Sequence, residues 1–150
     1  MKIRWIFFLL LLFLFCSIGH GLKPVPSERP GISGKVTFIG KWPLNTGEVR
    51  VAVYKEYPPS SFLNISAFSD PLPLYVSETE YFIQLQPGVY KWVLVAWRSE
   101  TQFWNPDNVL GYYKENPESI NPSPVIVREK TSTKNINIVA DFNNIKIAKR

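Results

Sequence analysis

The feature that most constrains the fold is a stretch that runs from Leu85 to Trp97. It contains the pair Pro87-Gly88, which is typical of a tight turn. After the turn, the residues up to Trp97 are β-branched, aromatic or aliphatic apart from Lys91, a composition that favours a long strand. The stretch therefore predicts the end of one strand, a turn, and a central strand over residues 88–97.

Alternating apolar and polar residues predict further strands on both sides of this turn. The candidate strands cover residues 32–38, 48–54, 79–85, 110–113, 125–127 and 135–142. In the second of them, the three valines are expected to face the core. No helical period follows the first residues of the chain, so we expect an all-β domain, a two-sheet antiparallel sandwich of about seven strands, transthyretin-like or Ig-like.

Residues 1–21 have the composition of a secretory signal peptide helix. Two basic residues precede an apolar run from Trp5 to Ile18, and cleavage is expected after Gly19 or Gly21. A helix of this length spans about 21 Å, less than the roughly 30 Å hydrocarbon core of a bilayer. Export to the periplasm, outer envelope or extracellular space is therefore favoured over a permanent anchor, which stays an alternative.

Lipidation of Cys16 is an alternative to plain cleavage of the signal peptide. The run Phe13-Leu14-Phe15-Cys16 resembles a bacterial lipobox, in which the cysteine is lipidated and becomes the mature N-terminus. A lipobox has a small residue directly before the cysteine, and Phe15 stands there instead. Membrane contact is thus expected only through the signal or through a lipid on Cys16.

The chain divides into four parts. They are a signal peptide (1–21), a Pro-rich tether (22–30), the β-sandwich domain (31–142) and a basic tail (143–150). Loss of the signal removes two basic residues and lowers the formal net charge of +5 by two. Because no basic run is interleaved with stacking aromatics, nucleic-acid binding is not expected.

The residue inventory argues against most catalytic and metal sites. The single histidine, His20, lies in the cleavage zone, and of the two cleavage routes only lipidation would retain the single cysteine, and then not as a thiol. Nucleophilic triads and zinc or copper sites need such side chains, so we expect neither an enzyme nor a cofactor.

Two weaker patterns carry oxygen ligands. Glu78 and Glu80 share one strand face, where a solvated edge is favoured over an acid–base pair. Asn105, Asp107 and Asn108 place three oxygen-bearing side chains together, where an Asx turn is favoured over a calcium site.

Three short motifs lie at the start, in the middle and at the end of the domain. They are Gly31-Ile32-Ser33-Gly34-Lys35-Val36, Leu85-Gln86-Pro87-Gly88-Val89-Tyr90 and Ile136-Asn137-Ile138. Together they resemble the carboxypeptidase-regulatory-like domains of bacterial envelope proteins, which share the transthyretin-like (prealbumin-like) sandwich. The resemblance implies a non-catalytic accessory or adhesive module at a cell envelope, with no catalytic residues.

The predicted central strand is apolar on both faces. Alternation assigns one set to the core, namely Tyr90, Trp92, Leu94 and Ala96. The other face carries Val93, Val95 and Trp97, and it needs a cover. Either the long loops 55–78 and 99–123 fold over it, bringing Phe62, Phe68, Phe103 and Trp104, or it is a binding surface.

The candidate ligand or partner surface therefore combines apolar strand residues with tryptophans. Its members are Trp42, Val93, Val95, Trp97 and Trp104. Aromatic side chains dominate contacts with sugar rings and with partner proteins. The sequence thus favours a non-catalytic exported module with an interaction or structural role, binding a protein partner or, as the alternative, a polysaccharide.

Overall fold

The computed structural model describes residues 29–145, and this part of the chain is built from ten strands and two short 3-10 helices. The expected all-β sandwich is confirmed. Cys16, the signal peptide, most of the tether and the end of the basic tail lie outside the described residues. None of the helices that the structure describes is long and apolar enough to cross a membrane.

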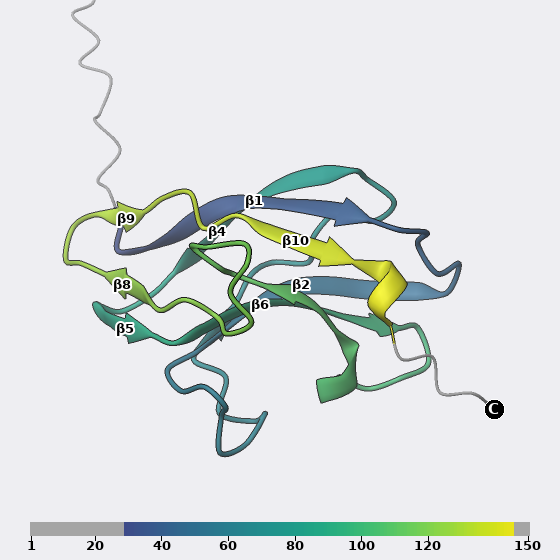
Figure 1. Ribbon diagram of the computed structural model, residues 1–150, viewed down its shortest axis with the longest axis horizontal. Helices are drawn as coiled ribbons and strands as arrows, with labels where there is room; N and C mark the ends of the chain where they lie inside the picture. Colours follow the sequence, from purple (N-terminus) through teal and green to yellow (C-terminus); the bar gives the residue numbers. More distant parts are fainter. Residues whose placement is uncertain (1–28, 146–150) are drawn as a thin grey trace, which may run out of the picture.

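Two sheets form the layers of the sandwich (Figure 1). The first sheet has the order β10 (Ile138–Asp141), β1 (Gly31–Ile39) and β4 (Glu78–Gln84), with β9 (Ser132–Thr133) also beside β1. The second sheet has the order β3 (Ala67–Phe68), β2 (Thr46–Tyr54), β6 (Trp92–Ser99) and β7 (Val109–Tyr112). A small ribbon pairs β5 (Gly88–Tyr90) with β8 (Val125–Val127), and the 3-10 helices are η1 (Pro106–Asn108) and η2 (Phe142–Asn144).

The pairing is antiparallel except where β9 and β10 pair with β1. Strands β9 and β10 both run parallel to β1, with Ile32 opposite Thr133 and Val36 opposite Ile138. β9 pairs with the first residues of β1 and β10 with its last residues, so two short strands together complete this edge of the first sheet. Between them, Asn137 Oδ1 accepts a hydrogen bond from Lys35 N at 2.9 Å. The predicted closing strand 135–142 is therefore shorter, and its parallel direction differs from the antiparallel sandwich that the sequence predicted.

The predicted central strand is split at Lys91. Its first part, β5, belongs to the ribbon, whereas β6 belongs to the second sheet. Lys91 N donates a hydrogen bond to Tyr54 O at 3.0 Å, and the strand re-enters a sheet one residue later. Because side chains alternate only along a continuous pleat, this break exchanges the two faces of the following strand.

The facing predicted for residues 92–97 is consequently wrong. Val93, Val95 and Trp97 lie in the main core, while Trp92 and Leu94 belong to a second cluster on the opposite face of the sheet. Tyr90, before the break, faces the core as predicted.

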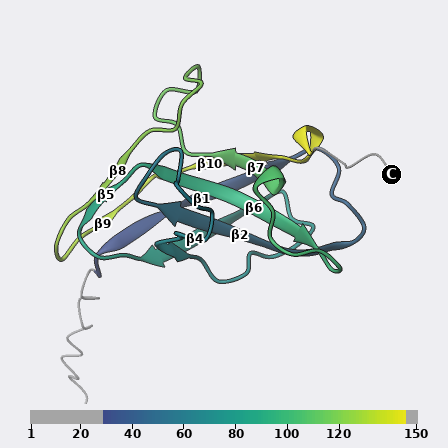
Figure 2. The ribbon, with the colours of Figure 1, turned by 90° about the horizontal axis from the view of Figure 1, so that it is seen from below.

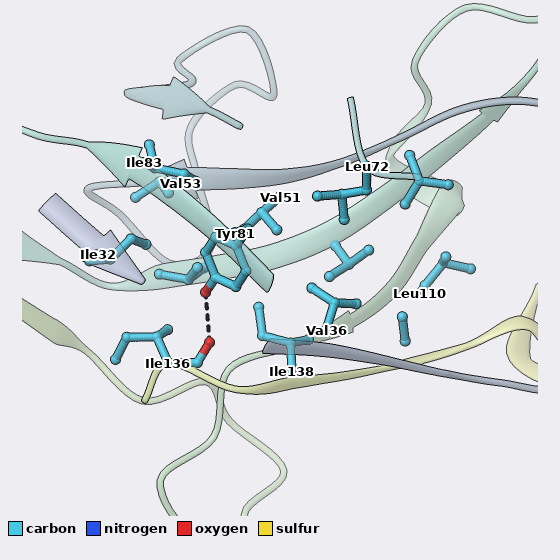
Figure 3. Packing of buried hydrophobic residues seen from close by; sticks show 14 of the residues in the cluster. Ile32, Val36, Val51, Val53, Leu72, Tyr81, Ile83, Leu110, Ile136 and Ile138 are labelled. Carbon is cyan, nitrogen blue, oxygen red and sulfur yellow. Dashed lines mark hydrogen bonds between the residues drawn. The ribbon is translucent and has the colours of Figure 1, made fainter. Parts of the chain in front are cut away.

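The main core lies between the two sheets (Figure 3). The valines of β2, which the alternation placed inward, are fully buried there: Val49, Val51 and Val53. Tyr81 reaches across from β4, and its hydroxyl donates a hydrogen bond to Ile136 O at 2.7 Å (Figure 3). On one side the two layers touch, because β7 contacts β10. Their backbones are so close there that a Cβ added to Gly111 would lie 2.0 Å from Val139 O.

We expect Tyr81→Phe to lower the free energy of unfolding by about 1–3 kcal/mol, because the buried Ile136 carbonyl loses its donor. Urea unfolding followed by fluorescence measures the change. The matched control is Tyr75→Phe, which removes an exposed hydroxyl that donates to Leu44 O. That variant should stay within about 0.5 kcal/mol of wild type. Equal effects of the two substitutions would contradict the role assigned to Tyr81.

Candidate functional site

The candidate site is the outer face of β2 and β6, which turns away from the main core (Figure 2 shows the two strands side by side). Four pairs face each other across this surface: Glu48 with Arg98, Arg50 with Ala96, Ala52 with Leu94, and Tyr54 with Trp92. Alternate residues of a strand share one face, so these pairs form a continuous series. The surface is charged at one end, small and aliphatic in the middle, and aromatic at the other end.

The middle of this surface is hollowed into a groove of about 400 Å³, which we call the β2–β6 groove. Its floor is Ala52, Leu94 and Ala96. Alanine leaves a depression here because the neighbouring pairs carry much larger side chains. The walls come from other segments, namely Phe62, Leu63, Ile65 and Phe68 on one side and Trp104 and Val109 on the other.

The wall formed by the segment between β2 and β3 is tied to the sheet. Tyr54 donates its hydroxyl hydrogen to Phe62 O at 3.0 Å, and Ser66 N donates to Val53 O at 2.8 Å. The Phe62 ring also lies 5.9 Å from the ring of Trp92, edge to face. These contacts hold the segment on the side of β2 away from β1 (Figure 1).

The long loops therefore cover one end of the outer face and leave its middle open. Trp92 is buried under Tyr57 and Phe62. By contrast, Ala96 is partly exposed at the floor of the β2–β6 groove, and Phe103 is 93% exposed and covers nothing. The sequence posed the choice between a loop cover and a binding surface for the face of Val93, Val95 and Trp97, and that face is instead covered by the main core between the sheets.

The charged end of the groove is a three-residue cluster. The Glu48 carboxylate accepts hydrogen bonds from Arg50 Nε on one oxygen, and from Arg98 Nε and Nη2 on the other at 3.0 and 2.8 Å. Burial by itself would raise the pKa of Glu48, but the hydrogen bonds and charges of the two arginines outweigh it. The pKa of Glu48 consequently lies below its ordinary value, and the cluster carries one net positive charge.

Both arginines also lie over aromatic rings of the walls. The Arg50 guanidinium is 4.8 Å from the centre of the Phe68 ring, and that of Arg98 is 5.9 Å from the Trp104 ring. Such cation–π contacts are favourable when the cation sits within about 6 Å of the ring. The charged end and the apolar walls are therefore packed against each other.

Of the five residues predicted to form a ligand surface, Trp104 is the one that lines this groove. Val93 and Val95 are fully buried in the main core and Trp97 is 6% exposed, so placing them on a surface is wrong. The physical reason is the exchange of faces at Lys91. Trp42 lies elsewhere, half-buried against Phe38 and Phe142 with ring centres 4.7 and 4.4 Å away.

Sequence reasoning missed the floor of the groove. Ala52 and Ala96 interrupt two strands of large residues, and this was the available signal. It becomes informative only once the register places them on one outer face, with Ala52 opposite Leu94 and Ala96 opposite Arg50. The facing of β6 had to be known first.

The two weaker sequence patterns lie in different places. Glu78 and Glu80 are outside the groove, and Asn105 is part of its lining. Glu78 and Glu80 are exposed on β4, and Glu78 pairs with Lys35 at 3.1 Å. Asn105 Oδ1 accepts a hydrogen bond from Asp107 N at 3.0 Å, which is the favoured Asx turn. Among residues 29–145, no group of three or more His, Cys, Asp or Glu is placed to hold a metal ion.

The chain was compared with protein-family models, with curated proteins and with solved structures, and none of them matches it.

Replacing Glu48 should expose the role of the charged cluster. We expect Glu48→Gln to lower the free energy of unfolding at neutral pH by about 1–2 kcal/mol, because an amide oxygen replaces a carboxylate that holds two arginines. A carboxyl group whose pKa is lowered by folding stabilises the protein above its unfolded pKa. That stabilisation is lost as the pH falls through the folded pKa.

The free energies of unfolding of wild type and Glu48→Gln should therefore converge in acid. Chemical unfolding of both proteins over a pH series measures this. A difference that stays constant down to strongly acidic pH would contradict the assignment of a lowered pKa to Glu48.

Proposed function

We propose that this protein is a non-catalytic binding module whose ligand places an apolar body in the β2–β6 groove. The observation that carries the proposal is the groove above the aliphatic floor of Ala52, Leu94 and Ala96, of which Ala96 is partly exposed. A sheet face of this kind is normally covered in a monomer. Here the covering segments stop short of it and form walls instead.

The dimensions and lining of the groove agree with a small-ligand site. Such sites usually have volumes of about 300–1,000 Å³, mostly apolar walls and a few polar groups at defined positions. The β2–β6 groove, at about 400 Å³, has its charged groups, Glu48 and Arg50, at one end. A ligand with an apolar body would therefore be desolvated along most of its length.

The polysaccharide alternative has less support. Trp104 is 45% exposed and offers a ring on which a sugar could stack. The floor, however, consists of Ala52, Leu94 and Ala96, whose side chains offer no hydrogen-bonding group to sugar hydroxyls. A buried sugar hydroxyl without a partner is unfavourable, so an apolar ligand fits this floor better.

Export to the cell envelope is part of the same proposal. It is supported by the apolar run from Trp5 to Ile18, with lipidation of Cys16 as a variant of the same route. Relationship to the carboxypeptidase-regulatory-like domains is likewise a proposal, supported by the motif Pro87-Gly88-Val89-Tyr90 shortly before β6.

The proposal predicts that the neutral fluorescent probe N-phenylnaphthylamine binds the protein. We expect Ala96→Phe to weaken this binding by at least about tenfold, because the new ring fills the floor of the groove. Fluorescence titration measures the affinity. The matched control is Val139→Phe, which adds a ring on the exposed outer face of β10 and should leave probe affinity unchanged.

Two results would contradict the proposal. One is a wild-type protein that does not bind the neutral probe. The other is a probe affinity that is the same in wild type and in a folded Ala96→Phe variant.

A further inference from the structure

We infer that the ligand of the β2–β6 groove is a long-chain carboxylate, with its chain on the aliphatic floor and its carboxylate on Arg50. This inference rests on the proposed function and adds the chemical class of the ligand. It depends on how Arg50 is held, on the charge of its surroundings and on the aromatic lining of the far end of the groove.

The Arg50 guanidinium is held on three sides by the protein. Its Nε donates to Glu48 Oε1, its Nη1 donates to Ser69 O at 2.9 Å, and its Cζ lies over the Phe68 ring, 4.8 Å from the ring centre. These contacts restrict a side chain that would otherwise lose considerable rotamer freedom on binding a ligand. Arg50 is thus a preorganised cation in the wall of an apolar groove.

One edge of this guanidinium remains available. In the part of the chain that the structure describes, Arg50 Nη2 has no hydrogen-bond partner, whereas Nε and Nη1 each have one. A guanidinium carries five N–H donors and binds carboxylates through planar, charge-assisted hydrogen bonds. An anionic group that reaches the wall of the groove therefore meets unused donors.

The local charge favours an anion over a cation. Glu48 is the acidic residue that lines the groove, and both of its oxygens already accept hydrogen bonds from Arg50 and Arg98. A cationic ligand would have to displace one of these arginines and would meet the net positive charge of the cluster. A carboxylate would meet that charge without displacing either of them.

The aromatic end of the groove suits the terminus of an alkyl chain. Phe62 packs against Tyr54 and Trp92, with ring centres 6.2 and 5.9 Å away. Tyr54 and Phe62 give this end of the groove an aromatic lining. An alkyl chain can lie against these rings, with its head group at the charged end near Arg50.

The test compares three ligands of equal chain length, decanoate, decanol and decylamine, as competitors of bound N-phenylnaphthylamine. We expect Arg50→Gln to weaken displacement by decanoate by about tenfold and to leave displacement by decanol unchanged. Displacement of the probe by decylamine should not be weakened by this substitution. The matched control is Arg128→Gln, an exposed arginine away from the groove, which should leave all three ligands unaffected.

A measurement on the wild-type protein covers the case in which Arg50→Gln does not fold. Raising the salt concentration should weaken decanoate binding more than decanol binding, because salt screens the attraction between charges. Equal salt dependence of the two ligands would overturn the inference.

The outcomes separate this inference from the proposed function. If the neutral probe does not bind, the proposed function fails. If the probe binds and Ala96→Phe blocks it, but Arg50→Gln weakens decanoate and decanol alike, the carboxylate inference alone fails. Displacement of the probe by an acidic apolar peptide but not by decanoate would also overturn the carboxylate inference.

Discussion

The antiparallel pairing of β2 with β6 is the interaction on which the rest of the structure depends. It runs from Thr46 opposite Ser99 to Tyr54 opposite Trp92, through the middle of the second sheet. One face of the pair supplies buried valines from both strands to the main core. The other face supplies the floor of the β2–β6 groove. Core and candidate site are therefore two faces of the same ladder, and a one-residue slip would exchange them.

Much of the core-facing side of the β2–β6 pair could be predicted from the sequence, and the side that forms the groove could not. Strict alternation placed Val49, Val51 and Val53 correctly, because β2 is a continuous strand. The same reasoning assigned β6 to the wrong faces, since nothing local shows that the chain changes sheets at Lys91. Both apparent faces of that strand are apolar, so composition could not choose between them.

The groove was harder to predict than the strands because it depends on small side chains and on distant loops. An alanine in a strand does not reveal whether it is covered. Ala52 and Ala96 become a floor only because Phe62 and Trp104, from two separate loops, stand beside them without crossing over them. Loops of this length have few local constraints. Their position here follows from a few specific contacts, such as the hydrogen bond from Tyr54 to Phe62 O.

The charged end of the groove links stability to binding. Arg50 holds Glu48 in place and also lines the groove, so one side chain would serve both the fold and the proposed ligand. A ligand carboxylate and Glu48 would then share the same cation, which weakens each contact slightly but restrains the arginine further. Because any molecule that binds only the folded state shifts the folding equilibrium, an occupied groove would stabilise β2 against β6. The alanine floor is thus the part of the second sheet's outer face that a ligand would cover.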